Sequence, residues 1–87
     1  MNEIREYLDE CYEGAAILEP DYLDEAIIGT SHDGCVVYSF EKLVQAFMEQ
    51  DGMTYEEAVE QIEYNTIRAI PYMGDFPPVI VYDLPEL

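Results

Sequence analysis

Residues 26–38 constrain the fold of this chain more than any other segment, because they have the sequence pattern of a β-hairpin. Two runs rich in apolar and β-branched residues, 26–30 and 35–38, are separated by a short polar stretch that ends in Asp33 and Gly34. An Asp-Gly pair between two such runs is typical of a tight turn that reverses the chain. The sequence therefore predicts two antiparallel strands here, against which the other elements must pack.

The length of the loop decides which side chains share a face of this hairpin. We expect the loop to be either Asp33-Gly34 alone or all of residues 31–34. Because side chains alternate along a strand, only a register shift by an odd number of residues would exchange the two faces. These two registers differ by an even number, so both predict one shared face formed by Ile28, Thr30, Cys35 and Val37.

Helical spacing of apolar residues predicts a helix before the hairpin. Asn2 can serve as its N-cap, and Gly14 is a natural end for it. Between them, apolar side chains recur every three or four residues, as on one face of a helix. These residues are Ile4, Tyr7, Leu8 and Cys11, followed by Ala15. Further on, the pair at 20–21 can open a single helical turn through residues 22–24.

Two more helices are predicted after the hairpin. Ser39 can cap a helix that ends at Gly52 and carries apolar residues at i, i+3, i+4 and i+7, namely Phe40, Leu43, Val44 and Phe47. Thr54 and Glu57 have the spacing of a capping box, which predicts the start of the next helix. That helix must end near Ile70, because a proline follows and disfavours α geometry in the residue before it.

A last strand is predicted at residues 79–82, after two prolines. The predicted order of elements is therefore α-β-β-α-α-β. This order is typical of an α+β fold, with a small, three-stranded, mostly antiparallel sheet and helices on one face. A length of 87 residues allows a single domain, residues 1–87.

The chain is strongly acidic, with 20 Asp and Glu against three Lys and Arg and a formal net charge of −17. Residues 1–25 have a net charge of −8, and residues 49–63 have a net charge of −6. A hydrophobic content of 49% argues against a disordered acidic tail. Because phosphate backbones and anionic lipids repel such a surface, we expect no direct binding of nucleic acid and no membrane binding.

Eight glutamates follow helical spacing in these two acidic regions. The first ridge consists of Glu3, Glu6, Glu10 and Glu13, and the second consists of Glu56, Glu60 and Glu63 with Glu57 beside them. Like charges at such spacings destabilise a helix by a few tenths of a kcal/mol, so stability alone does not explain them. We predict that both ridges bind a partner, with Tyr7 and Tyr64 as aromatic anchors. The alternative interpretation is a solvated face that only keeps the protein soluble.

The remaining motifs do not indicate catalysis or a metal site. Ser31, His32 and Asp33 are the residue types of a catalytic triad, but neighbours in a tight turn point apart instead of converging. His32, Cys35 and Cys11 supply fewer ligands than the four that structural zinc usually takes. We therefore expect a protein that is not an enzyme and that has no cofactor and no metal.

The cysteines and the N-terminus favour a cytoplasmic protein. The first residues are acidic and lack the apolar segment of a signal peptide. The chain has no apolar run near the roughly 20 residues that a membrane span requires. Cys11 and Cys35 are expected to be reduced and to fill core positions.

Three stretches carry a resemblance: AIIGTSHDGCVVYSFEKLV, MTYEEAVEQIEYNTIRAIPYMG and PPVIVYD. They resemble a group of small accessory proteins encoded by viruses of bacteria and archaea and by prophages, most of them without an assigned function. The resemblance covers residues 26–82 and offers no catalytic residue to transfer. Strongly acidic members of such groups include inhibitors of host defence, such as anti-CRISPR proteins and restriction inhibitors that mimic DNA.

The resemblance and the charge pattern together imply a viral inhibitor that acts in the cytoplasm of the infected host cell. It would occupy the nucleic-acid-binding groove of a basic host protein, a CRISPR effector or a restriction nuclease. The alternative is a small protein-interaction or regulatory module, with a homodimer as one form of it, in which the acidic residues only confer solubility.

Overall fold

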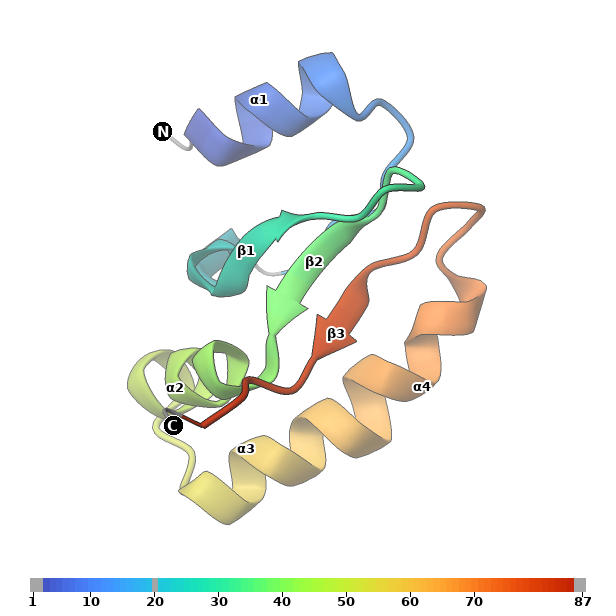
Figure 1. Cartoon of the computed structure of the whole chain (residues 1–87). Coiled ribbons are helices and arrows are strands. Elements are labelled where there is room, and N and C mark those ends of the chain that lie inside the picture. Colours follow the sequence, from blue (N-terminus) through green and yellow to red (C-terminus); the bar gives the residue numbers. More distant parts are fainter. Residues whose placement is uncertain (1–2, 20, 86–87) are drawn as a thin grey trace.

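The computed structural model describes residues 3–19 and 21–85 (Figure 1). Its elements are, in chain order, α1 (Glu3–Cys11), the 3₁₀ helix η1 (Asp21–Ala26), β1 (Ile27–Thr30), β2 (Val36–Ser39), α2 (Phe40–Asp51), α3 (Tyr55–Gln61), the π-helical turn η2 (Ile62–Thr66), α4 (Ile67–Ala69), the 3₁₀ turn η3 (Ile70–Tyr72) and β3 (Val79–Val81). The predicted α+β fold is confirmed. The predicted cap Asn2 lies outside the described residues.

The three strands form a mixed sheet with β2 in the middle (Figure 1). β1 pairs with β2 in antiparallel fashion, as the hairpin pattern predicted, whereas β2 and β3 are parallel. A parallel pair needs a crossover connection, and the helical run from α2 to η3 supplies it.

The hairpin loop has three residues, 32–34, so the shared face predicted from the sequence is wrong. The Ser31 N–H donates to the Cys35 carbonyl at 2.8 Å, and Thr30 pairs with Val36 in the adjacent rung. An odd loop length moves the register by one residue relative to the two expected loops. Such a shift exchanges the two faces of the strand.

A β-bulge in β1 changes the register a second time. Gly29 pairs with Val37, but Ile27 pairs with Tyr38, so Ile28 is the additional residue. The hairpin turn itself contains Gly34 at a φ of 90°, a left-handed conformation that glycine adopts without steric cost. Directly paired residues point to the same face, which places Ile27 and Thr30 with Val36 and Tyr38.

The core lies on this face of the sheet, and the helices pack against it. Val36 and Tyr38 of β2 are fully buried and form one cluster with apolar residues of the helices, including Leu8, Leu23, Leu43, Phe47, Ala58 and Ile62. The prediction of helices on one face is thereby confirmed. On the opposite face Val37 is half-buried and Val79 is exposed.

The predicted helix starts after the hairpin are confirmed. The Ser39 hydroxyl accepts a hydrogen bond from the Lys42 N–H at 3.2 Å, and Gly52 ends α2 at a φ of 69°. In the capping box, the Thr54 N–H donates to the Glu57 carboxylate at 2.9 Å, and the Glu57 N–H donates to the Thr54 hydroxyl at 3.2 Å. These caps satisfy backbone groups that the first helical turn leaves unpaired.

The third predicted helix is interrupted by the π-helical turn η2. Its α geometry ends at Ala69, close to the position predicted from the following proline, and continues as the 3₁₀ turn η3. The spacing of apolar residues did not predict the π turn, because one inserted residue leaves most of the helical periodicity intact.

α1 is attached to the fold differently from the prediction. Leu8 is buried, but Ile4, Tyr7 and Cys11 of the expected apolar stripe are exposed. The expectation that Cys11 fills a core position is therefore wrong, whereas Cys35 is buried as expected. Both thiols are free.

Candidate acidic interface

The first ridge lies on the solvent side of α1. Glu3, Glu6 and Glu10 are exposed and fall on the side of the helix opposite Leu8. Glu13 is also exposed, but α1 ends at Cys11, so Glu13 belongs to the turn that follows instead of the helix. The ridge therefore has three helical members and one on the adjoining turn.

The second ridge lies on α3 and on the π turn that follows it. Glu56 and Glu60 are exposed on the side of α3 opposite Ala58, and Glu63 is exposed on η2. The Glu57 carboxylate accepts the hydrogen bond of the capping box, so its first role is structural. The three other members present their carboxylates to solvent.

The bases of the chain do not neutralise these ridges. Arg5 forms an ion pair with Asp24 at 2.6 Å, and the Arg68 guanidinium lies over the Tyr64 ring at 5.3 Å from its centroid. Lys42 lies in the first turn of α2 and is exposed. Within residues 3–19 and 21–85, no Lys or Arg lies within ion-pair distance of a ridge glutamate.

The two ridges are carried by helices at opposite ends of the molecule. In Figure 1, α1 lies at the top of the view, next to the β1 edge of the sheet. α3 lies at the bottom, next to α2 and on the β3 side. The described chain measures 35 × 31 × 28 Å along its principal axes. A partner that touches both ridges must therefore span most of the molecule.

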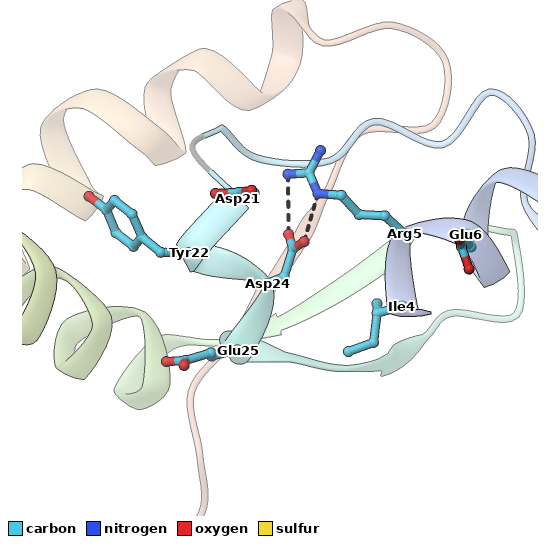
Figure 2. A pocket seen from close by; sticks show the side chains of 7 residues that line it. All are labelled: Ile4, Arg5, Glu6, Asp21, Tyr22, Asp24 and Glu25. Carbon is cyan, nitrogen blue, oxygen red and sulfur yellow. Dashed lines mark hydrogen bonds and ion pairs between the residues drawn. The ribbon is translucent and has the colours of Figure 1, made fainter. Parts of the chain in front are cut away.

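A shallow groove of about 650 Å³ lies between α1 and η1 (Figure 2). The Arg5 side chain extends from α1 across it to Asp24, while Glu6, Asp21 and Glu25 add carboxylates along its edges. The Asp24 side chain is only 5% exposed, and Arg5 also donates to the Leu18 carbonyl at 3.3 Å. The hydrogen bond with Asp24 raises the pKa of Arg5. This ion pair therefore joins α1 to the rest of the fold.

The two tyrosines predicted as anchors are both exposed. Tyr7 is on α1 with its ring centroid 6.2 Å from that of Tyr12, and the neighbouring Cys11 thiol raises the pKa of its hydroxyl. Tyr64 lines a groove of about 270 Å³ along α3 together with Glu57 and Glu60. Each ridge thus has an exposed aromatic ring beside its carboxylates.

An uncharged sheet face is the surface that sequence reasoning missed. None of the three strands contains a charged residue. Ile28 and Val79 are exposed at the two edge strands. The signal that could have revealed this face was the absence of polar alternation in the strands, since a solvated sheet face usually carries polar side chains.

The residues of the hairpin turn serve its geometry. The Ser31 hydroxyl donates to the Asp33 carboxylate at 2.8 Å and accepts from the Cys35 N–H at 3.0 Å. The first of these bonds lowers the pKa of Asp33. His32 is exposed, and its ring takes no part in these two hydrogen bonds. In the described part of the chain, no three His, Cys, Asp or Glu residues form a group that could hold a metal ion.

The chain matches no protein-family model, and no curated protein or solved structure is significantly similar to it. Over residues 3–19 and 21–85, no helix combines the length and the apolar character needed to cross a membrane.

Proposed function

We propose that the protein is a non-enzymatic, virus-encoded inhibitor that binds the nucleic-acid-binding groove of a basic host defence protein, such as a CRISPR effector or a restriction nuclease. It would act in the cytoplasm of the infected cell as a mimic of the phosphate backbone. The viral origin and the class of target rest on the sequence resemblance. The single observation that supports mimicry is the set of exposed ridge glutamates that no Lys or Arg of the described residues neutralises.

The mechanism is competition for the cations that normally hold phosphates. Carboxylates on α1 and α3 would pair with Arg and Lys side chains along the groove, and Tyr7 and Tyr64 would pack against its walls. Long-range attraction between the acidic protein and the basic groove would accelerate their encounter. Added salt screens this attraction, so the affinity should fall as ionic strength rises.

A binding experiment with ridge variants tests this proposal. The variant Glu6→Lys, Glu10→Lys, Glu60→Lys, Glu63→Lys reverses four exposed ridge carboxylates and spares the capping box. The control Glu19→Lys, Glu25→Lys, Glu49→Lys, Asp75→Lys makes the same change in net charge at exposed positions outside the ridges.

Both variants and the original protein are used as bait in host lysate, and each recovered protein is purified and tested for competition with its nucleic acid. We expect a nucleic-acid-binding protein that the original and the control retain and that the ridge variant loses. Equal retention by the ridge variant would contradict mimicry.

A second candidate function is a small interaction module, in homodimeric form or with another protein, whose acidic residues only confer solubility. The observation that favours it is the uncharged sheet face with exposed Ile28 and Val79. Apolar association is unchanged or strengthened by salt. Sedimentation equilibrium at about 50 mM and about 500 mM NaCl therefore separates the two functions. Electrostatic binding of a basic partner weakens over this range, whereas apolar association does not.

A further inference from the structure

A second kind of contact is available beside the second ridge, in a groove between α2 and the start of α3. Its volume is about 290 Å³, just below the range typical of small-molecule pockets, and it is more enclosed than the grooves beside α1 and along α3. The lining residues are Phe40, Glu41, Val44, Gln45, Met48 and Tyr55.

The local sequence builds this groove through the turn that joins the two helices. The left-handed Gly52 ends α2 and Thr54 caps α3, so the chain reverses within a few residues. Tyr55, the first residue of α3, returns to the side of α2 that carries Met48. The groove therefore lies at the corner where α2 and α3 meet.

The groove has an apolar floor and exposed apolar walls. Phe40 and Val44 form the floor and are almost completely buried, and the Phe40 ring is held by the Tyr82 ring at a centroid distance of 4.8 Å. On the walls, Met48 is 39% exposed and Tyr55 is 57% exposed. Methionine adapts its shape to a partner, and tyrosine is enriched at interface hot spots.

The charges around the groove are acidic. Glu41 lies on its rim, and Glu56 and Glu57 directly follow Tyr55 in α3. Lys42 is two residues before Val44, so it projects about 200° away from it around the helix. The rim therefore favours a ligand that carries positive charge next to its apolar part.

We propose that this groove binds one large apolar side chain, leucine or an aromatic residue, from a protein segment in which lysine or arginine flanks that side chain. The inference rests on the proposed function and deepens it: the carboxylates of the second ridge hold the cations, and the groove distinguishes one basic segment from another. A basic peptide of the same charge without such a side chain would lack this contact, so the groove would favour the basic segment that carries one.

Two blocked heptapeptides test the proposal directly. One has leucine between two runs of three lysines, and the other has alanine at that position. Binding of each peptide to the full chain is measured at low ionic strength by titration, with the Met48 methyl signal followed by NMR. We expect the leucine peptide to bind about tenfold more tightly, which corresponds to burying the additional apolar side chain, and to shift the Met48 methyl signal.

Two variants locate the effect. Met48→Gln replaces an exposed wall of the groove with a polar side chain of similar length, and Ile28→Gln makes a comparable change at an exposed apolar residue of β1. We expect Met48→Gln to remove the preference for leucine and Ile28→Gln to retain it. Circular dichroism and thermal unfolding are used to verify that both variants fold.

The outcomes separate this inference from the proposed function. If both peptides bind equally and lose affinity with added salt, the groove proposal is overturned while the acidic ridges retain their role. If neither peptide binds at low ionic strength, both proposals are contradicted. If the preference for leucine survives in Met48→Gln, the apolar contact lies elsewhere and the groove proposal is also overturned.

Discussion

The two acidic helices, α1 and α3, both carry glutamates at helical spacing, but they are attached to the fold in different ways. α3 continues into a long helical run, and its Ala58, together with Ile62 of η2, is fully buried against the core. α1 buries Leu8 and depends on the ion pair between Arg5 and Asp24. The acidic surface of α3 is therefore independent of the contacts that hold this helix in place, whereas in α1 an ion pair also fixes the position of the ridge.

The largest expected effect is the loss of the ion pair. Arg5→Leu leaves the Asp24 carboxylate, which is only 5% exposed, without its guanidinium. Because breaking an ion pair whose carboxylate is buried is costly, and because Arg5 itself is one-third exposed, we expect a loss of about 2–4 kcal/mol in the free energy of unfolding. Urea denaturation followed by circular dichroism measures it.

A matched change on the other helical run serves as the control. Arg68→Leu removes an exposed guanidinium that lies over the Tyr64 ring, and we expect a loss below about 1 kcal/mol. The double variant Arg5→Leu, Asp24→Leu should recover part of the loss, since it removes the buried charge as well. Equal losses for Arg5→Leu and Arg68→Leu would contradict the proposed difference between the helices.

The next effect is an alkaline transition that originates in the core. Burial raises the pKa of Tyr38 to about 12, above the value of about 10 for an unfolded tyrosine. The neutral hydroxyl therefore stabilises the fold fully below about pH 10, and this contribution is lost as the pH rises through about 12. We expect a loss of about 2 kcal/mol over that interval.

Denaturation at stepped pH, together with the absorbance of the phenolate, measures this transition. Burial and the hydrogen bond to Asp51 also raise the pKa of Tyr22 to about 12, so Tyr22→Phe is expected to reduce the pH dependence in part. Tyr38→Phe should reduce it further, although it also removes the acceptor of the Leu18 N–H. A pH dependence unchanged in both variants would refute the assignment.

A smaller effect is expected from the cap of α2. Ser39→Ala removes the acceptor of the Lys42 N–H and the donor to the Asp83 carboxylate, a hydrogen bond of 2.6 Å. We expect a loss of about 1–2 kcal/mol, as for other N-cap serines. Thr54→Ala at the exposed cap of α3 should cost about 1 kcal/mol. A smaller loss for Ser39 than for Thr54 would show that the bond to Asp83 adds no stability.

The smallest effects are expected from the ridges themselves. Glu10→Gln on α1 and Glu60→Gln on α3 each remove one exposed like charge from a helix. We expect both variants to gain a few tenths of a kcal/mol, with the gain disappearing at high salt. Loss of stability in either variant would show that the ridge glutamate has a structural role.

Local signals in the sequence predicted the helices after the hairpin well. Ser39, Gly52 and the capping box at Thr54 are determined by backbone chemistry within a few residues, and the structure has all of them. The faces of the hairpin were not predictable, because the loop has an odd number of residues and β1 contains a bulge at Ile28. Neither feature leaves a distinctive mark in the sequence.

The candidate site was predictable in its residues but not in its arrangement. Helical spacing identified the exposed glutamates, but it also extended the first ridge to Glu13, which lies beyond the end of α1. The pairing of Arg5 with Asp24 joins residues 19 positions apart, and the groove at Met48 and Tyr55 depends on how two helices pack. Such contacts arise from tertiary structure and have no periodicity that a sequence can reveal.

The most direct test of the account is the salt dependence of binding to the recovered host protein. Its dissociation constant is measured between about 50 mM and about 500 mM NaCl for the original protein, the ridge variant and the control of equal charge. We expect the affinity to fall at least about tenfold over this range for the original and the control, and the ridge variant to bind weakly throughout. An affinity that stays constant or rises with salt, and that the ridge variant retains, would contradict it.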